Sequence, residues 1–417
     1  MKVTVIGAGS TYTPELVEGI LRQLNVLPVT RLTLYDVDRA RLDVLGGLTH
    51  RMVAAVGASV RVSTTLDLVE AIGDAEFVLV QLRVGQQSAR VLDETLPQRF
   101  GLLGQETTGP GGFGKALRTI RVVRDIADQV RVHAPEAWIL NFTNPVGIVT
   151  RALLDDGHRV LGLCNVASSF TRLFAGLLGV DAASIELDHA GLNHLTWIRS
   201  VRVDGAERIS ELLAAPLRAE IAADIEQPEE LLGVLDAIPS YYLKYFYATR
   251  SMTARQRENP RVDDVLRIER ELLTMYADPG LACKPALLAQ RGGAHYSRVA
   301  GALMCSLHAG DGARHYVNVR NGSTIAGLSP DAVVEVPALI DQDGASSVDV
   351  TPLPPELLSL VQSVTAYEEL TLAAARSGRR DLAVRALVAH PLVREIDLAE
   401  SYVDALLAAD DLAPQLG

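Results

Sequence analysis

The stretch that most constrains the fold is the first fourteen residues. A short apolar run at residues 3–6 stops at the motif Gly-Ala-Gly-Ser of residues 7–10. Thr13 and Pro14 then open a segment with helically spaced apolar residues; Thr is a preferred N-cap, and Pro suits the first helical turn. The pattern predicts a strand, a glycine turn and a helix. Such a turn directs free backbone N–H groups at an anion, and the pyrophosphate of a dinucleotide fits this context.

The glycine turn departs from the usual dinucleotide motif at one position. The third glycine of G-x-G-x-x-G is replaced by Tyr12. We expect Gly7, Gly9 and Ser10 to contact the cofactor. The alternative is a glycine-rich turn that only links a strand to a helix.

A second strand is predicted at residues 31–36, and it ends in Asp36. An acidic residue in this place ordinarily holds the ribose 2′-OH, although the gap here is longer than the usual roughly 20 residues. Asp36 would accept a hydrogen bond from the 2′-OH and repel a 2′-phosphate, which favours NAD over NADP. An ordinary N-cap or turn aspartate is the alternative interpretation.

Apolar runs alternate with helical patterns through the rest of the first 170 residues. Buried strands are expected near residues 76–82, 137–142 and 159–164, with helices near 114–132 and 146–154. This alternation predicts an α/β fold with a Rossmann-type, doubly wound parallel sheet.

Beyond about residue 170 the pattern changes. Residues 195–203 alternate as a strand with one exposed face, and residues 317–350 are predicted as short strands and turns. Helical stretches surround both segments. We therefore expect two domains, a dinucleotide-binding domain at residues 1–170 and a second α+β domain at residues 171–417.

The composition argues against several classes of protein. Hydrophobic residues make up 48% of the chain and charged residues 22%, and no apolar run approaches the roughly 20 residues of a membrane span. A net charge of −12 argues against nucleic acid as a partner, because phosphate binding requires a basic face. The three cysteines form no CxxC motif, and no signal-peptide pattern is evident, so we expect reduced thiols in a cytoplasmic protein.

Polar side chains follow several of the predicted strands. Arg83, Asn141, Asn144 and Cys164 fall at carboxyl ends, where ligands bind in doubly wound sheets. Cys164 and His194 could together hold a divalent metal and leave positions open for substrate oxygens and water. A buried structural cysteine and a hydrogen-bonded core histidine are the alternative.

Two further segments are rich in residues that can carry chemistry. Residues 83–113 are predicted to form a long polar loop, which in a compact domain is typical of a lid or a binding loop. An ordinary glycine-rich surface excursion is the alternative. Residues 239–247 are dense in tyrosine, and such a tyrosine could pack in the core or, beside a metal or a carboxylate, act as a base.

Seven motifs follow one another along nearly the whole chain. They are Val-Ile-Gly-Ala-Gly-Ser from residue 5, Gly-Gln-Glu-Thr-Thr-Gly from 104, Asn-Phe-Thr-Asn-Pro from 141, Gly-Leu-Cys-Asn from 162, Gly-Leu-Asn-His from 191, Arg-Gly-Gly from 291 and His-Pro-Leu from 390. In this order they resemble glycoside hydrolase family 4, the NAD- and metal-dependent glycosidases. The sequence is most similar to the 6-phospho-β-glucosidase branch. Asn165 follows Cys164 where α-specific relatives carry an aspartate proposed as the acid.

The resemblance implies roles for the residues around the metal. Cys164 and His194 would hold the divalent ion, typically Mn²⁺. Tyr242 would be the base, with the adjacent Tyr241 as the alternative. Glu106 would raise the basicity of that tyrosine.

The resemblance also implies a substrate and a reaction. Arg90, Asn144 and Arg261 match substrate-binding positions, and the arginines would help to hold the sugar and its 6-phosphate; the role of Arg291 stays open. The reaction would be hydrolysis of 6-phospho-β-glucosides by oxidation at C3, removal of the C2 proton, elimination of the aglycone, addition of water and re-reduction. NAD would then be recycled in every turnover. The implied assembly is a homodimer or homotetramer, and a 2-hydroxy-acid dehydrogenase of the malate/lactate type is the alternative function.

Overall fold

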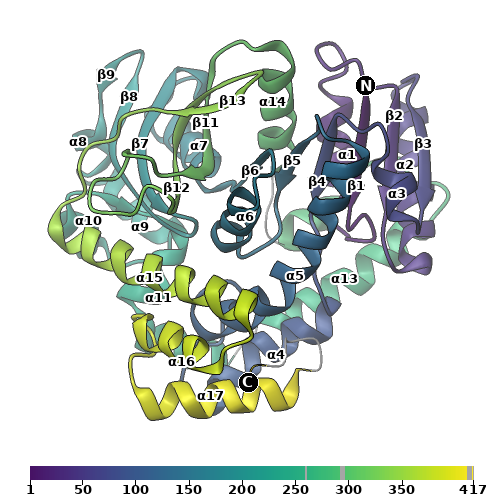
Figure 1. Cartoon of the computed structure of the whole chain (residues 1–417). Coiled ribbons are helices and arrows are strands. Elements are labelled where there is room, and N and C mark those ends of the chain that lie inside the picture. The colour runs from purple at the N-terminus through teal and green to yellow at the C-terminus, as the bar shows by residue number, and fades with distance from the viewer. Residues whose placement is uncertain (259–260, 292–295, 411–415, 417) are drawn as a thin grey trace.

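The computed structural model describes residues 1–258, 261–291, 296–410 and 416. The two glycines that follow Arg291 in its motif lie outside the described residues. Within the described part of the chain, thirteen strands form one continuous sheet (Figure 1).

Six strands come from the N-terminal part of the chain: β1 (Lys2–Ile6), β2 (Arg31–Tyr35), β3 (Arg61–Thr65), β4 (Phe77–Val80), β5 (Trp138–Asn141) and β6 (Val160–Gly162). They are parallel and lie in the order β3-β2-β1-β4-β5-β6. This order is that of a Rossmann fold, and it confirms the predicted fold class. Every residue of β1 and β4 is buried, which explains their continuous apolar runs.

Past β6 the sheet continues with strands from the C-terminal part: β7 (Ile185–Leu192), β8 (Leu195–Val203), β9 (Ala206–Glu207), β10 (Ile238–Pro239), β11 (Ala313–Arg320), β12 (Val333–Asp341) and β13 (Gly344–Ser347). β11 lies antiparallel beside β6, followed by β12, β7, β8 and β10. Gly162 pairs with Asn318 of β11, and Asn318 pairs with Glu335 of β12. Glu335 in turn pairs with Gly191 of β7, so one row of residues crosses four strands.

The helices of the N-terminal part are α1 (Thr13–Leu21), α2 (Arg39–Ala55), α3 (Leu68–Ile72), α4 (Gln86–Arg99), α5 (Gly109–His133), α6 (Val146–Asp155) and α7 (Val166–Leu178). Those of the C-terminal part are α8 (Ile209–Leu212), α9 (Leu217–Asp224), α10 (Glu229–Leu235), α11 (Lys244–Tyr247), α12 (Thr249–Glu258), α13 (Arg261–Ala277), α14 (Tyr296–Ala309), α15 (Pro355–Ser377), α16 (Arg380–Ala389) and α17 (Ile396–Ala409). Three short 3₁₀ turns lie at Ala182–Ser184, Tyr241–Leu243 and Ala286–Arg291. The last three helices, yellow in Figure 1, line one end of the molecule, where α15 packs on α5 and α17 on α4.

The prediction of a long polar loop at residues 83–113 is wrong. Residues 86–99 of this segment form helix α4, and α5 begins as early as Gly109. The buried side of α4 carries Arg90, Asp93 and Glu94, which pair with one another or with charges on neighbouring elements. Because half of the buried residues of α4 are charged, the helical hydrophobic period is weak.

Smaller differences have equally local causes. The strand at residues 195–203 has no exposed face along most of its length, because Trp197 packs in one hydrophobic core and Ile198 in another. The segment predicted as short strands and turns, residues 317–350, contains the end of β11, the nine-residue β12 and the four-residue β13. No strand was predicted at β7 and no helix at α16. The N-cap of α1 is Tyr12, and the Thr13 hydroxyl donates instead to the Ala8 carbonyl at 2.8 Å.

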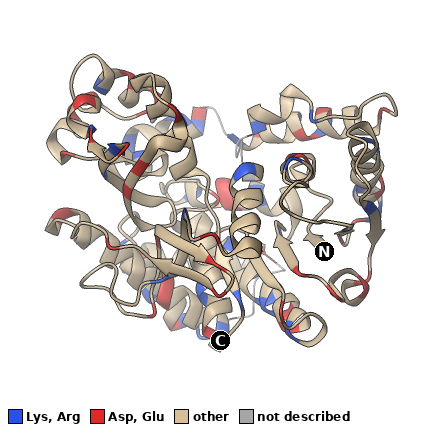
Figure 2. Cartoon of the chain, turned by 90° about the horizontal axis from the view of Figure 1, so that it is seen from above, with Lys and Arg blue, Asp and Glu red and all other residues tan. Residues whose placement is uncertain are grey.

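Two further features of the described residues are the character of the helices and the distribution of charge. None of the helices among them has the length and apolar character needed to cross a bilayer. Acidic and basic residues are interspersed along the described chain (Figure 2).

Candidate active site

A cavity of about 1020 Å³ opens beyond the carboxyl ends of the parallel strands. Its wall includes residues that directly follow β1, β2, β4 and β5. Nine of the predicted site residues line it: Gly7, Gly9, Ser10, Asp36, Arg90, Glu106, Asn144, Tyr242 and Arg261.

The turn between β1 and α1 forms one end of this cavity. Gly7 has a φ of +83°, and a Cβ there would lie 2.8 Å from Leu82 Cα. A Cβ on Gly9 would lie 2.8 Å from the Asp36 carboxylate. Both positions therefore require glycine. A turn without these side chains lets a pyrophosphate approach the backbone closely, so the residues present fit a dinucleotide.

Asp36 lies at the same end of the cavity, directly after β2. Its Oδ2 accepts a hydrogen bond from Gly9 N at 2.7 Å, and its Oδ1 accepts one from Asp38 N at 3.0 Å. Backbone donors on both oxygens fix the carboxylate at the cavity wall. It is therefore placed to meet a group that binds next to the glycine turn.

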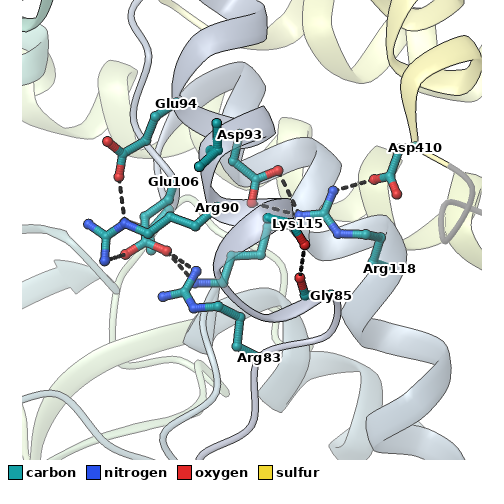
Figure 3. A network of polar contacts seen from close by, with 12 residues as sticks. Arg83, Gly85, Arg90, Asp93, Glu94, Glu106, Lys115, Arg118 and Asp410 are labelled. Carbon is teal, nitrogen blue, oxygen red and sulfur yellow. Dashed lines mark hydrogen bonds and ion pairs between the residues drawn. The ribbon is translucent and has the colours of Figure 1, made fainter. Parts of the chain in front are cut away.

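Glu106 lies in the cavity wall among three cations (Figure 3). It pairs with Arg83, with Lys115 Nζ at 3.0 Å and with Arg90 Nη1 at 3.4 Å. Burial alone would raise the pKa of Glu106, but the charges of these three residues lower it well below its usual value. The Glu106 side chain is therefore ionised at neutral pH.

A second set of ion pairs, also drawn in Figure 3, links helix α4 to α5 and to Asp410. Arg118 of α5 donates to Asp93 Oδ1 of α4 at 2.6 Å and also pairs with Asp410, which follows α17. Asp93 lies one helical turn from Arg90. These buried pairs connect the C-terminal helix with the element that carries a predicted substrate residue.

The cavity is basic although the chain as a whole is acidic. Six Arg and Lys residues line it, against four Asp and Glu residues. The net charge of the whole chain is −12. A local surplus of cations in a cleft favours anionic ligands such as phosphate esters.

The three predicted substrate residues approach this cavity from different elements. Arg90 of α4 is only 9% exposed, and its Nε donates to Glu94 Oε1 at 2.7 Å. Asn144 follows β5, and its Oδ1 is buried without a hydrogen-bond partner among the described residues. Arg261, at the start of α13, is exposed and donates from Nη2 to the Gln290 carbonyl at 2.9 Å. The buried and unpartnered Asn144 oxygen is available to a ligand.

Tyr242 connects the cavity with the predicted metal ligands. Its ring stacks on His194 with the ring centroids 3.5 Å apart and the planes 7° from parallel. Burial raises the pKa of Tyr242 well above its ordinary value, and the neighbouring Cys164 raises it further. Tyr242 thus lies close to both predicted ligands while it lines the cavity.

His194 occupies the tight turn between β7 and β8, with a φ of +63°. Its Nδ1 lies 3.2 Å from Thr107 Oγ1, whereas its Nε2 is buried and has no hydrogen-bond partner in the described chain. Burial lowers the pKa of His194 to about 4, so the imidazole is neutral at pH 7. A neutral imidazole with a free nitrogen fits a divalent metal, and so does the buried thiol of Cys164, whose charge also acts on Tyr242. Among the described residues, no group of three or more His, Cys, Asp or Glu forms a larger metal site.

A buried carboxylate, Glu335 of β12, supports the turn that carries His194. It accepts hydrogen bonds from His189 Nε2 at 2.9 Å, Asn193 Nδ2 at 2.9 Å and Asn318 Nδ2 at 3.1 Å. Burial alone would raise the pKa of Glu335, but its hydrogen bond and charge interaction with His189 lower it below the usual value. Because Asn193 directly precedes His194, Glu335 helps to fix the position of the imidazole.

Tyr241, the alternative base, has a different environment from Tyr242. Its hydroxyl donates to Asp224 Oδ2 at 2.8 Å, and its ring stacks on Phe170 at a centroid distance of 4.8 Å. It is not among the residues that line the cavity. Of these two neighbouring tyrosines, Tyr242 lines the cavity and Tyr241 does not.

The site also contains residues that the sequence analysis did not single out. Lys115 was hidden in a helical pattern, and only its contact with Glu106 shows that it belongs to the site. Thr107 lies in the recognised motif from residue 104, but its contact with His194 depends on the fold. The sequence gives no indication of Glu335, because a single acidic residue within a strand is not a recognisable motif.

The fold and the site together define an enzyme of the Rossmann class, in which a dinucleotide-type turn, a basic wall and Tyr242, stacked on the buried His194, line one cavity. A sequence profile of the family 4 glycosyl hydrolases matches residues 2–180, and the profile of the C-terminal domain of that family matches residues 189–393. The chain belongs to this family, as the resemblance implied.

Individual relatives agree with this assignment. The chain is 38% identical to a probable 6-phospho-beta-glucosidase of Bacillus subtilis, over 98% of this chain and 96% of the relative. It is 35% identical to a 6-phospho-beta-glucosidase of Escherichia coli, over 99% and 95%. The structure of a Thermotoga maritima 6-phospho-beta glucosidase with manganese, NAD+ and glucose-6-phosphate matches with a TM-score of 0.93 and 31% identity, over 100% of both chains.

Proposed function

We propose that this chain hydrolyses 6-phospho-β-glucosides. The observation that carries the proposal is a single basic cavity that extends from the glycine turn to Tyr242, whose ring stacks on His194. The relatives named 6-phospho-beta-glucosidase support the β linkage and the 6-phosphate. Asn165, in the place of an acidic residue after Cys164, also favours the β over the α type.

We propose NAD and Mn²⁺ as the bound groups, and the manganese- and NAD-containing relative supports both. Bound together, they supply reversible oxidation at sugar C3 and polarisation of the oxidised sugar, which makes the C2 proton acidic. The residues proposed to hold them are Gly7, Gly9, Ser10 and Asp36 for NAD, and Cys164 and His194 for the metal.

Tyr242 is the proposed base, and its oxygen, as the phenolate, accepts the proton from C2. Stacking on His194 fixes the ring at the cavity wall. After burial and Cys164, the charge of Glu106 is a further cause that raises the pKa of Tyr242. Glu106 thereby makes the phenolate a stronger base once it has formed.

The substrate is proposed to be held by Arg90, Asn144 and Arg261. The unpartnered Asn144 Oδ1 can accept a hydrogen bond from a sugar hydroxyl. The two guanidinium groups suit the 6-phosphate, because each carries a permanent positive charge and several N–H donors.

We further propose that residues 1–170 and 171–417 act as cofactor and substrate domains in a homodimer or homotetramer of the cytoplasm. Light scattering of the purified chain measures the oligomer directly. The alternative function, a 2-hydroxy-acid dehydrogenase, would accumulate NADH from a hydroxy acid without a metal. Membership of a hydrolase family favours hydrolysis.

A chromogenic assay tests the proposed function. The nitrophenyl 6-phospho-β-glucoside is compared with its unphosphorylated and α-linked counterparts, with and without NAD⁺ and Mn²⁺ under reducing conditions. We expect rapid nitrophenol release from the phosphorylated β-glucoside alone, and only with both additions. Equal turnover of the α-linked compound, or turnover independent of NAD⁺, would contradict the proposal.

A further inference from the structure

We propose that Thr107, held by Gln105, is a positioning residue that sets the tautomer of His194 and presents its Nε2 to the metal. This inference rests on the proposed metal site. It concerns two residues of the motif Gly-Gln-Glu-Thr-Thr-Gly that directly flank Glu106.

The direction of each hydrogen bond follows from Gln105. Its Oε1 lies 2.6 Å from Thr107 N, 2.6 Å from Thr108 N and 2.9 Å from Thr107 Oγ1. Two of these partners are backbone N–H groups, which can only donate, so the side-chain atom that meets them is the carbonyl oxygen. The Thr107 hydroxyl therefore donates its one proton to Gln105.

The same hydroxyl then determines the state of His194. With its proton committed to Gln105, Thr107 Oγ1 can only accept from His194 Nδ1, which lies 3.2 Å away. In the neutral ring the proton is thus on Nδ1, and Nε2 keeps its lone pair. That Nε2 is buried and unpartnered among the described residues, as expected of a nitrogen reserved for a metal.

Two glycines near the start of α5 leave room for the segment that carries Gln105 and Thr107. A Cβ on Gly111 would lie 2.4 Å from the Gln105 carbonyl oxygen, and one on Gly112 would lie 2.7 Å from the Thr107 carbonyl carbon. Only glycine lets residues 105–107 pack so closely against the helix. The segment that carries Gln105 and Thr107 is therefore packed directly against the start of α5.

Thr107→Val tests the inference, because valine keeps the shape of threonine and removes the hydroxyl; Thr107→Ser keeps the hydroxyl and is the matched control. Free Mn²⁺ is measured by its electron paramagnetic resonance signal in titrations of the reduced protein. We expect Thr107→Val to weaken Mn²⁺ binding by about 10–100-fold and Thr107→Ser by less than about 3-fold. NAD⁺ affinity and the thermal unfolding midpoint serve as checks that the fold is retained.

A second measurement keeps the test decisive if Thr107→Val folds poorly. Nitrogen-15 NMR of histidine-labelled, metal-free wild-type protein reports which nitrogen of His194 carries the proton, with His194→Ala assigning the signal. We expect the proton on Nδ1 in the wild type. A proton on Nε2, or equal Mn²⁺ affinity in Thr107→Val and wild type, would overturn the inference. Unchanged Mn²⁺ binding in His194→Ala would instead overturn the metal site of the proposed function.

Discussion

Tyr242 lies face to face on His194, with the two ring centroids 3.5 Å apart. One ring lines the cavity, and the other belongs to the proposed metal pair. A proton acceptor and a metal site can therefore act on neighbouring atoms of one sugar. His194 directly precedes β8 and Tyr242 follows β10, and because these two strands pair in the sheet, the fold brings together two residues about fifty positions apart in the sequence.

The two adjacent tyrosines are expected to differ sharply on substitution. Tyr242→Phe keeps the stack on His194 but removes the proton acceptor, so kcat should fall by about 10²–10⁴-fold. Tyr241→Phe loses only the hydrogen bond to Asp224 and should change kcat by less than about 3-fold. Steady-state kinetics with the phosphorylated β-glucoside compare the two variants. A larger loss in Tyr241→Phe would make Tyr241 the base.

Asp36 is expected to set the preference for NAD⁺ over NADP⁺. Asp36→Asn retains an oxygen that can accept from Gly9 N but removes the charge that repels a 2′-phosphate. The ratio of NADP⁺ to NAD⁺ dissociation constants should fall by about 10-fold, which corresponds to roughly 1.4 kcal/mol. Fluorescence titration measures both constants. Asp38→Asn, at the N-cap of α2, is the control and should leave the ratio unchanged.

Glu335→Gln is expected to destabilise the protein in a pH-dependent way. The variant removes a buried charge that three donors surround, at a cost of about 3 kcal/mol near neutral pH. The pKa of Glu335 is lower in the folded protein, so its stabilisation is present above the unfolded pKa of about 4.3 and is lost as the pH falls through the folded value. The difference in unfolding free energy between wild type and variant should therefore shrink below about pH 4.

Urea denaturation at several pH values measures this difference. Glu186→Gln provides the control, since Glu186 is exposed on β7 and its ion pair with Arg314 lies at the surface. Its effect should stay below about 0.5 kcal/mol. A constant difference for Glu335→Gln across the acidic range would show that its charge contributes nothing.

The sequence predicts the Rossmann half well because that half is locally encoded. The strands β1 and β4 are buried on both faces and appear as apolar runs, and the turn at Gly7 and Gly9 demands glycine. Helix α4 was missed because its buried side is charged, and no apolar period marks it. Local patterns cannot reveal charges that are satisfied by partners distant in the chain.

The residues of the candidate site likewise differ in how far the sequence alone reveals them. Cys164 and His194 stand out as residue types, and Tyr242 is indicated by family resemblance. Thr107 and Glu335 act through contacts that span 87 and 142 positions. A threonine or a glutamate gives no sign of such a contact before the chain is folded.

Hydrogen exchange at sugar C2 tests the central claim most directly. A 6-phospho-β-glucoside with deuterium at C2 is turned over in light water with NAD⁺ and Mn²⁺, and the glucose 6-phosphate formed is analysed by mass spectrometry. If a base removes the C2 proton in every turnover, the product should carry protium from the solvent at C2. Complete retention of the deuterium would contradict the account.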